Sequence, residues 1–361
     1  MTWVAVRKVW DQQGLGGKVL WLSLLPASLL YGRIVQARNA LYNHGWMKAH
    51  ELRRPVISVG NLTVGGTGKT PTCLWLAQEL TARGLRPGIL SRGYRRKESV
   101  PLVLQPNGEV GSGVDDDEIT KAGDEPLMMA RLYGQTVGVC RSRIAAATEL
   151  LRKVNVDVFI LDDGFQHRRV KRDVDVVLLG ADASGWVLPA GPFREPLRNL
   201  RRADFLLSTA ENNGWHSVIT DGRAKVSFSG LLRPTALIAL GARGCKELPL
   251  NLLHGSKILT VTGVADPRRL YRLIHDWEGE IVETLEFSDH HYYTARDWQR
   301  INRLGRLVDL IITTEKDILK LARFPFAKDK LLALRVAMTV ENGAALIDAI
   351  VAKIEQGRGR A

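Results

Sequence analysis

The residues whose types and spacing are best suited to chemistry form a glycine-rich stretch at 60–70. A β-branched run at 56–59 precedes this stretch, and a segment with helical spacing, 72–80, follows it. A strand, a glycine-rich turn and a helix start form a P-loop, whose backbone N–H groups curl around phosphate oxygens. The sequence therefore predicts a nucleotide site in which Lys69 reaches the outer phosphates and the Thr70 hydroxyl binds Mg²⁺. The residues expected to hold the nucleotide are Thr63, Val64, Gly65, Gly66, Thr67, Gly68, Lys69 and Thr70.

The glycine-rich stretch departs from the usual P-loop pattern at one position. The pattern G-x-x-x-x-G-K-[ST] has glycine where this chain has Thr63. The alternative is a glycine-rich turn that binds no ligand. The strand before the turn and the helix after it favour the P-loop interpretation.

A second candidate site lies where the apolar run 156–161 ends in Asp162 and Asp163. A P-loop needs a carboxylate that serves Mg²⁺, commonly at the end of a neighbouring buried strand. In an extended chain these two side chains point to opposite faces, so at most one is expected to bind the metal directly. The alternative is a strand-ending Asp-Gly turn with no ligand.

Strand-like and helical segments alternate along the rest of the chain. Strand-like runs occupy 174–179, 205–207, 258–264 and 307–313, and helical spacing marks 141–153 and 297–304. This alternation predicts an α/β fold of the P-loop NTPase kind, a mostly parallel sheet with helices on both faces.

Composition and charge limit the class of protein. The 361 residues are 45% hydrophobic and 25% charged, which excludes wholesale disorder, collagen and a coiled coil. Cys73, Cys140 and Cys245 lie far apart, so a disulfide framework or zinc site is not expected and a reducing compartment fits. The net charge of +13 favours anionic partners, which are nucleic acid, lipid headgroups or phosphorylated substrates.

The N-terminal segment 1–55 is basic and apolar at once. It has eight Lys and Arg against two acids, and an apolar run of thirteen residues, 19–31, contains Pro26. A helix that crosses the hydrocarbon core needs roughly 20 residues, so a full span is disfavoured. Trp and Tyr interspersed with Lys and Arg are typical of a segment that lies in a membrane interface. The alternative is an N-terminal helix pair that packs on the core.

Several motifs together resemble one known family. The chain resembles the tetraacyldisaccharide 4'-kinases, the lipid A 4'-kinases of Gram-negative bacteria, nearly from end to end. Thr63 at the early P-loop position is typical of that family, so the departure noted above supports the resemblance. The matching motifs are Ser58–Pro71, Leu90–Tyr94, Gly123–Pro126, Leu161–His167, Pro189–Pro196, Phe287–Tyr292 and Thr314–Asp317.

The resemblance implies transfer of the ATP γ-phosphate to the 4'-hydroxyl of an acylated glucosamine disaccharide 1-phosphate, giving lipid IV-A in lipid A biosynthesis. The location would be the cytoplasmic face of the bacterial inner membrane, with the protein held peripherally or monotopically on an anionic membrane surface. No nucleic acid partner is expected. The implied domains are membrane-associating helices (1–50), a P-loop domain (51–225), a two-stranded linker (226–240) and a smaller C-terminal α/β domain (241–361) closing over the active site.

The resemblance also implies roles for single residues. Asp124 would accept the hydroxyl proton, with His290 as its partner, although the sequence does not decide between His290 and His291. Glu125 would complete the Mg²⁺ shell. The implied metal ligands are Thr70, Glu125, Asp162 and Asp163, and the implied substrate contacts are Asn61, Arg92 and Arg194.

For two arginines and one motif the sequence leaves alternatives open. Arg92 and Arg194 suit phosphate because a guanidinium binds it bidentately, but Arg92 is equally consistent with a surface cation and Arg194 with a local pair to Glu195. The motif 314–317 follows a strand and would either support the site or contact the nucleotide.

Two other functions fit part of the sequence. A P-loop ATPase that acts as a switch or partition protein on another macromolecule explains the P-loop and the positive charge. It requires neither the apolar N-terminus nor Asp124 with His290. A small-molecule P-loop ligase or kinase would lack membrane dependence.

Overall fold

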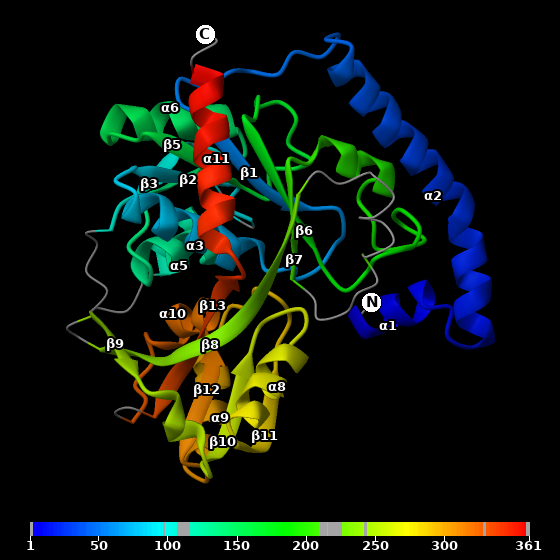
Figure 1. Cartoon of the computed structure of the whole chain (residues 1–361). Helices are drawn as coiled ribbons and strands as arrows, with labels where there is room; N and C mark the ends of the chain where they lie inside the picture. Colours follow the sequence, from blue (N-terminus) through cyan, green and yellow to red (C-terminus); the bar gives the residue numbers. More distant parts are fainter. Residues whose placement is uncertain are drawn as a thin grey trace. The chain divides into compact units, whose positions relative to one another are not determined.

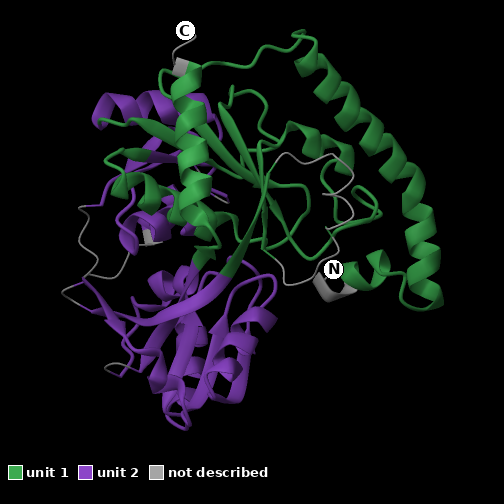
Figure 2. Ribbon diagram, in the orientation of Figure 1, with its two compact units in different colours: residues 1–87, 155–231, 338–361 green, residues 88–154, 232–337 purple. Residues whose placement is uncertain are grey.

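The computed structural model describes residues 3–94, 96, 98–106, 116–209, 215, 226–241, 244–327 and 330–358. The chain divides into two compact units (Figure 2). Unit 1 consists of Met1–Pro87, Asn155–Leu231 and Met338–Ala361, and unit 2 consists of Gly88–Val154 and Leu232–Ala337.

Unit 1 is built on a parallel sheet with the strand order β8–β7–β6–β1–β5. All residues of β1, β5 and β6 are buried, which is the pattern of a parallel sheet covered on both faces. The helix α3 (Lys69–Ala82) packs on β1 and β5, and α11 (Gly343–Arg358) contacts α3 and β6 (Figure 1). The strands are β1 (Val56–Asn61), β5 (Val158–Asp162), β6 (Val174–Leu179), β7 (Phe205–Ser208) and the first part of β8 (Ser227–Gly241).

The N-terminal helices of unit 1 are α1 (Trp3–Trp10) and α2 (Gly14–Asn43), which has 30 residues. The helix α2 runs through Pro26 without interruption. A proline forgoes one hydrogen bond to the preceding turn, and the remaining bonds of a long helix hold it together. By length and composition α2 is able to cross a membrane, and only 11% of its most apolar window is buried.

The first part of unit 2 contains three neighbouring strands in the order β2–β4–β3. Strands β2 and β4 are parallel, and β3 pairs with β4 in the antiparallel sense. Helix α6 packs on β3 and β4, and α4 contacts α5. The elements are β2 (Pro87–Ser91), β3 (Leu102–Leu104), β4 (Val137–Val139), α4 (Asp116–Ala122), α5 (Asp124–Arg131) and α6 (Arg143–Lys153).

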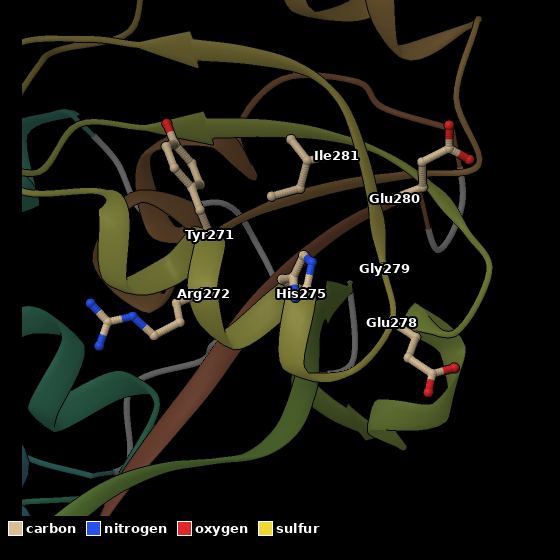
Figure 3. A pocket seen from close by; sticks show the side chains of 7 residues that line it. All are labelled: Tyr271, Arg272, His275, Glu278, Gly279, Glu280 and Ile281. Carbon is tan, nitrogen blue, oxygen red and sulfur yellow. The ribbon is translucent and has the colours of Figure 1, made fainter. Parts of the chain in front are cut away.

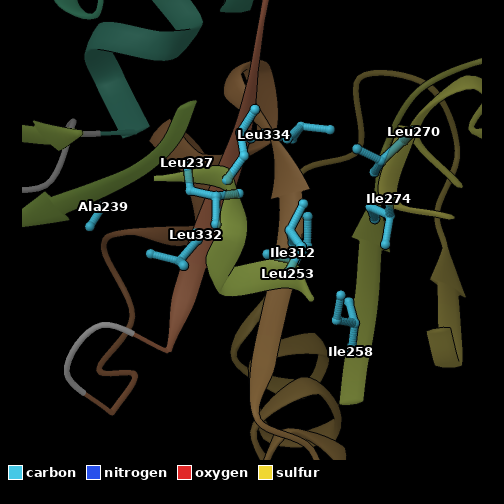
Figure 4. Close-up of a cluster of buried hydrophobic side chains, with 10 residues drawn as sticks. Leu237, Ala239, Leu253, Ile258, Leu270, Ile274, Ile312, Leu332 and Leu334 are labelled. Carbon is cyan, nitrogen blue, oxygen red and sulfur yellow. The ribbon is translucent and has the colours of Figure 1, made fainter. Parts of the chain in front are cut away.

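The second part of unit 2 has the strand order β11–β10–β12–β13–β8, with β9 antiparallel to β8. Buried aliphatic side chains such as Leu237, Ile258 and Ile312 form its core (Figure 4). Helix α10 packs against α5, so it joins the two parts of unit 2. The elements are β9 (Gly244–Leu248), β10 (Lys257–Thr262), β11 (Glu280–Glu286), β12 (Leu310–Thr314), β13 (Leu331–Val340), α8 (Arg268–Asp276), α9 (Ala295–Gly305), α10 (Glu315–Leu321) and two 3₁₀ segments, Leu197–Arg202 of unit 1 and Leu250–Leu253.

The sheets confirm the predicted α/β class with mostly parallel strands, while one local prediction is wrong. Segment 226–240 does not hold two short strands, because β8 is one strand through Pro234. A proline fits extended backbone and only lacks one ladder donor. The units also differ from the consecutive domains that we expect, since residues 88–154 pack in unit 2 and 338–361 in unit 1.

Candidate active site

The glycine-rich loop of unit 1 connects the carboxyl end of β1 to the start of α3. Gly65 and Gly68 have φ values of 114° and 85°, in the left-handed region that favours glycine. A methyl group at Gly66 would meet no atom within 4 Å, so the backbone there is open to a ligand. An open, glycine-rich turn at a helix N-terminus fits a phosphate group.

Asn61, the last residue of β1, is hydrogen-bonded to this loop. Its side chain is buried, and its Nδ2 donates a hydrogen bond of 2.8 Å to Thr67 Oγ1. The backbone carbonyl of Asn61 accepts a 2.8 Å hydrogen bond from Gln166 Nε2, in the loop after β5. The amide that was expected to contact substrate is therefore used inside the protein, and it fixes the shape of the loop.

The segment 192–194 packs beside Thr63 and explains why this position is not a glycine. Thr63 is buried and forms an antiparallel bridge with Phe193, and Val64 N donates to Pro192 O at 2.9 Å. A bridge residue is extended and has no need of the glycine found in the usual pattern. Arg194 N donates to Leu62 O at 2.7 Å, so the same bridge places Arg194 beside the P-loop.

Asp163 lies between two cations of unit 1. Lys69 Nζ is 3.7 Å from Asp163 Oδ1 and 3.4 Å from Asn61 Oδ1. Arg194 donates to both oxygens of Asp163, at 3.0 and 2.8 Å. Arg194 thus pairs with Asp163, whereas the carboxylate of Glu195 accepts bonds from Asn39, Asn199 and Arg202.

Asp162 is the last residue of β5 and is buried beside α3. The Cys73 thiol contacts Asp162 Oδ1 at 3.7 Å, and burial together with this carboxylate raises the pKa of Cys73 well above its usual value. Asp163 has a φ of 50°, so it has left the extended strand and the expected alternation of the two side chains does not apply to it. Both carboxylates and Thr70 belong to unit 1.

In unit 2, Asp124 is the first residue of α5. His290 Nδ1 lies 3.2 Å from Asp124 Oδ2, and Lys320 Nζ lies 3.1 Å from the same oxygen. His291 points to another carboxylate, with its Nε2 3.1 Å from Asp297 Oδ2. The structure therefore brings His290, and not His291, to Asp124.

The surroundings of Asp124 favour its ionised form. Burial alone raises the pKa of this carboxyl, but the hydrogen bond from His290 and the charge of Lys320 outweigh burial. The net result is a pKa well below the usual range of an aspartate. Asp124 is therefore a carboxylate at neutral pH, able to accept a proton.

The motif 314–317 supports Asp124 from within unit 2. Thr314 caps α10 and Asp317 is fully buried. Lys316 Nζ lies 3.0 Å from Asp289 Oδ1, next to His290. Burial lowers the pKa of Lys316, but the charges of Asp289 and Glu125 overcome this and raise it above its usual value. These contacts favour a supporting role for the motif, because they hold residues around Asp124.

Two other features stand apart from these contacts. Arg92 is exposed in the segment that follows β2. A hollow of about 730 Å³ lies at α8 and β11 and contains none of the predicted site residues (Figure 3). It is lined by Tyr271, Arg272, His275, Glu278, Gly279, Glu280 and Ile281.

Within the described part of the chain, no three His, Cys, Asp or Glu side chains converge as a preformed metal site.

Comparison with known proteins gives the family. The model of a family described as tetraacyldisaccharide-1-P 4'-kinase matches residues 20–355. The chain belongs to this family. Relatives named tetraacyldisaccharide 4'-kinase include one from Halothermothrix orenii, 36% identical with 85% of this chain and 84% of the relative covered. Another, from Actinobacillus succinogenes, is 35% identical, with 94% and 98% covered.

A solved structure agrees with the family assignment. The crystal structure of LpxK from Aquifex aeolicus in complex with ATP matches with a TM-score of 0.74 and 32% identity. The match covers 93% of this chain and 99% of the Aquifex chain. These similarities confirm the resemblance found in the sequence and do not favour a switch or partition ATPase.

Sequence reasoning missed one side chain beside Asp124 in unit 2 and gave no separate role to another, Glu315 of the motif 314–317. Lys320, which contacts Asp124, gives no signal except its position three residues after Asp317. Glu315 is buried between the Tyr133 hydroxyl at 2.7 Å and Arg335 Nε at 2.9 Å. Glu315 therefore ties the turn after α5 to α10 and β13.

We expect Glu315→Gln to lower the free energy of unfolding by about 3 kcal/mol, because it leaves the half-buried Arg335 without its inner carboxylate. The matched control is Glu247→Gln, which removes the exposed carboxylate on the same guanidinium and should cost under about 1 kcal/mol. Urea denaturation of the purified variants measures both. Equal losses for the two variants would refute the structural role given to Glu315.

Proposed function

We propose that this chain transfers the γ-phosphate of ATP to the 4'-hydroxyl of a tetraacylated glucosamine disaccharide 1-phosphate, producing lipid IV-A. The observation that carries the proposal is the Asp124–His290 contact of 3.2 Å in a protein that also has a P-loop. Phosphoryl transfer to a hydroxyl needs a proton acceptor as well as a phosphate site. A switch ATPase has no need of an acceptor for a sugar hydroxyl.

The nucleotide would be held by unit 1. The backbone of Gly65–Gly68 and the ammonium of Lys69 would bind the phosphates, and the Thr70 hydroxyl would bind Mg²⁺. When bound, Mg²⁺ neutralises charge on the β- and γ-phosphates. Asp162, at the end of β5, suits the metal side of this site, because hydroxyl and carboxylate oxygens are the ligands that Mg²⁺ prefers. Glu125 of unit 2 stays a candidate for the same shell.

Unit 2 would supply the proton acceptor. Asp124 takes the hydroxyl proton as the oxygen–phosphorus bond forms, and His290 orients the carboxylate. A carboxylate with a low pKa is a weak base, which is sufficient because little proton transfer is needed in a loose transition state.

Phosphate oxygens would be bound by guanidinium groups. Arg194 is held at the P-loop by Asp163 and is suited to a phosphate in transfer, and exposed Arg92 is suited to a substrate phosphate. For Asn61 we propose a supporting role only, because its buried amide is bonded to the loop.

A membrane-facing role for α2 is supported by the distribution of its side chains. The buried residues are small or polar, and Ser28 Oγ and Asn39 Nδ2 bond to Val187 O and Glu195. The exposed residues include seven large apolar side chains, which a helix on a water-soluble core would bury. We therefore infer attachment of this face to the cytoplasmic side of the inner membrane. The exposed apolar residues are Leu15, Val19, Leu20, Leu22, Leu29, Leu30 and Ile34.

We expect Leu22→Glu/Leu29→Glu to lower the fraction of protein that sediments with anionic phospholipid vesicles by tenfold or more. Removing each leucine from an apolar environment costs roughly 2 kcal/mol, before the cost of the added charge. Leu307→Glu, at an exposed leucine outside α2, is the control and should sediment like the wild type. Unchanged sedimentation of the α2 variant would disprove attachment through this face.

The reaction is tested with γ-labelled ATP and an acylated disaccharide 1-phosphate in detergent micelles. Label should appear on the lipid only when protein, ATP and Mg²⁺ are all present. Label released as inorganic phosphate at the same rate with and without the lipid would overturn the proposal.

A further inference from the structure

Lys320 is a buried cation with two carboxylate partners. Its side chain is 3% exposed, and its Nζ lies 3.1 Å from Asp124 Oδ2 and 2.9 Å from Asp317 Oδ1. The third contact of the ammonium group is the carbonyl of His291, at 3.1 Å. The ammonium group thus donates two hydrogen bonds, to Asp124 Oδ2 and the His291 carbonyl, and forms an ion pair with Asp317.

Asp317 is itself immobilised, so Lys320 is attached to a rigid part of unit 2. The buried Asp317 Oδ2 accepts from Gly263 N at 2.9 Å and from Thr314 Oγ1 at 2.8 Å. These bonds come from the end of β10 and the cap of α10. A lysine held this way keeps its ammonium group in one place and loses the freedom of its long side chain.

The two oxygens of Asp124 are treated differently. Both His290 Nδ1 and Lys320 Nζ contact Oδ2. Within the part of the chain that the structure describes, Oδ1 makes no hydrogen bond or ion pair to protein. One oxygen is thus saturated and the other is available to an incoming group.

We infer that Lys320 is a positioning residue for the transfer reaction: by holding Oδ2 together with His290, it leaves Asp124 Oδ1 as the atom that accepts the substrate proton. This inference rests on the proposed kinase function. The acceptor O–H bond breaks and its proton bonds to Oδ1. The electron pair of the hydroxyl oxygen forms the bond to the γ-phosphorus, and the bond to ADP breaks with its pair on the leaving oxygen.

The alternative is that Lys320 only stabilises the fold, and a mutant cycle separates the two roles. Lys320→Met alone would leave Asp317 buried without its cation, so the cycle is built on Asp317→Asn, which removes that charge and is the reference. Lys320→Met is then added in the presence of Asp124 and, separately, together with Asp124→Asn. The readouts are kcat, the KM for ATP, and the midpoint of thermal unfolding.

With Asp124 present, we expect Lys320→Met to lower kcat by about 10- to 100-fold while the KM for ATP changes less than twofold, because a small misplacement of a reacting group is costly. Together with Asp124→Asn, the same change should alter kcat less than twofold, since a positioning residue has then lost its target.

An equal loss of kcat in both backgrounds, or no loss in either, would overturn the inference. If Asp124→Asn alone left kcat unchanged, the proposed role of Asp124 would fail first, which is a different result. A fall in the unfolding midpoint of the reference and the test variant alike does not affect the comparison, because both carry Asp317→Asn.

Discussion

Lys69→Ala is expected to reduce phosphate transfer by about 10²- to 10³-fold, the loss found when one strong donor to developing negative charge is removed. Lys69 begins α3 directly after the glycine-rich loop, and its ammonium group lies between Asn61 Oδ1 and Asp163 Oδ1. In the proposed nucleotide site this position would give the outer phosphates a cation that the backbone N–H groups do not provide. Initial rates at saturating lipid, with ATP varied, measure the effect.

The control for Lys69 is a lysine of the same unit that has only an exposed partner. Lys171 pairs with Glu51 at 2.9 Å, and both side chains are more than half exposed. Lys171→Ala should keep transfer within twofold of the wild type. Near-normal transfer by Lys69→Ala, with Lys171→Ala equally active, would remove the P-loop from the account.

Asp124→Asn should slow transfer by on the order of 10²-fold or more, the usual contribution of a proton acceptor. Asparagine has nearly the shape of aspartate, but its side chain takes no proton and lacks the charge that His290 and Lys320 stabilise. The loss should appear in kcat, while ATP binding is spared because the phosphate-holding residues are untouched. Single-turnover transfer and ATP binding by calorimetry separate these quantities.

Asp117 provides the comparison for Asp124, since it lies in α4 of the same unit and is 63% exposed. Asp117→Asn should transfer phosphate at close to the normal rate. If Asp124→Asn instead weakened ATP binding and kept full turnover at saturation, Asp124 would be a binding residue and the proton would go elsewhere.

The P-loop was predictable because its signal is local. The β-branched run, the glycines and the helical spacing occur in one short stretch, and they form β1, the loop and α3. The strand-like runs at 174–179 and 205–207 likewise became β6 and β7, because continuous apolar runs suit the interior of a parallel sheet.

The start of helix α9 separates the roles of His290 and His291. Thr294 and Asp297 form a capping box at the start of α9, and the Asp297 carboxylate also contacts the His291 ring. The spacing of Thr and Asp before a helical run is visible in the sequence. His290, with a φ of 58°, faces Asp124, and a histidine adopts this backbone conformation too seldom for the sequence to predict it.

The remaining features depend on long-range packing. Lys320 meets Asp124 across 196 positions of the chain, and α10 reaches α5 only because residues 88–154 return to unit 2. Local periodicity reports the faces of single elements and contains no information on which distant elements meet. The path of β8 through Pro234 was missed for a similar reason, since ladder partners outweigh a single proline.

The position of the new phosphate on the lipid product tests the central claim most directly. After reaction with ATP, ³¹P–¹H correlation spectroscopy of the purified lipid should give a second phosphorus signal coupled to the proton on C4' of the distal sugar. Coupling of that signal to a different sugar proton, or a lipid that still has only its original 1-phosphate, would contradict the account.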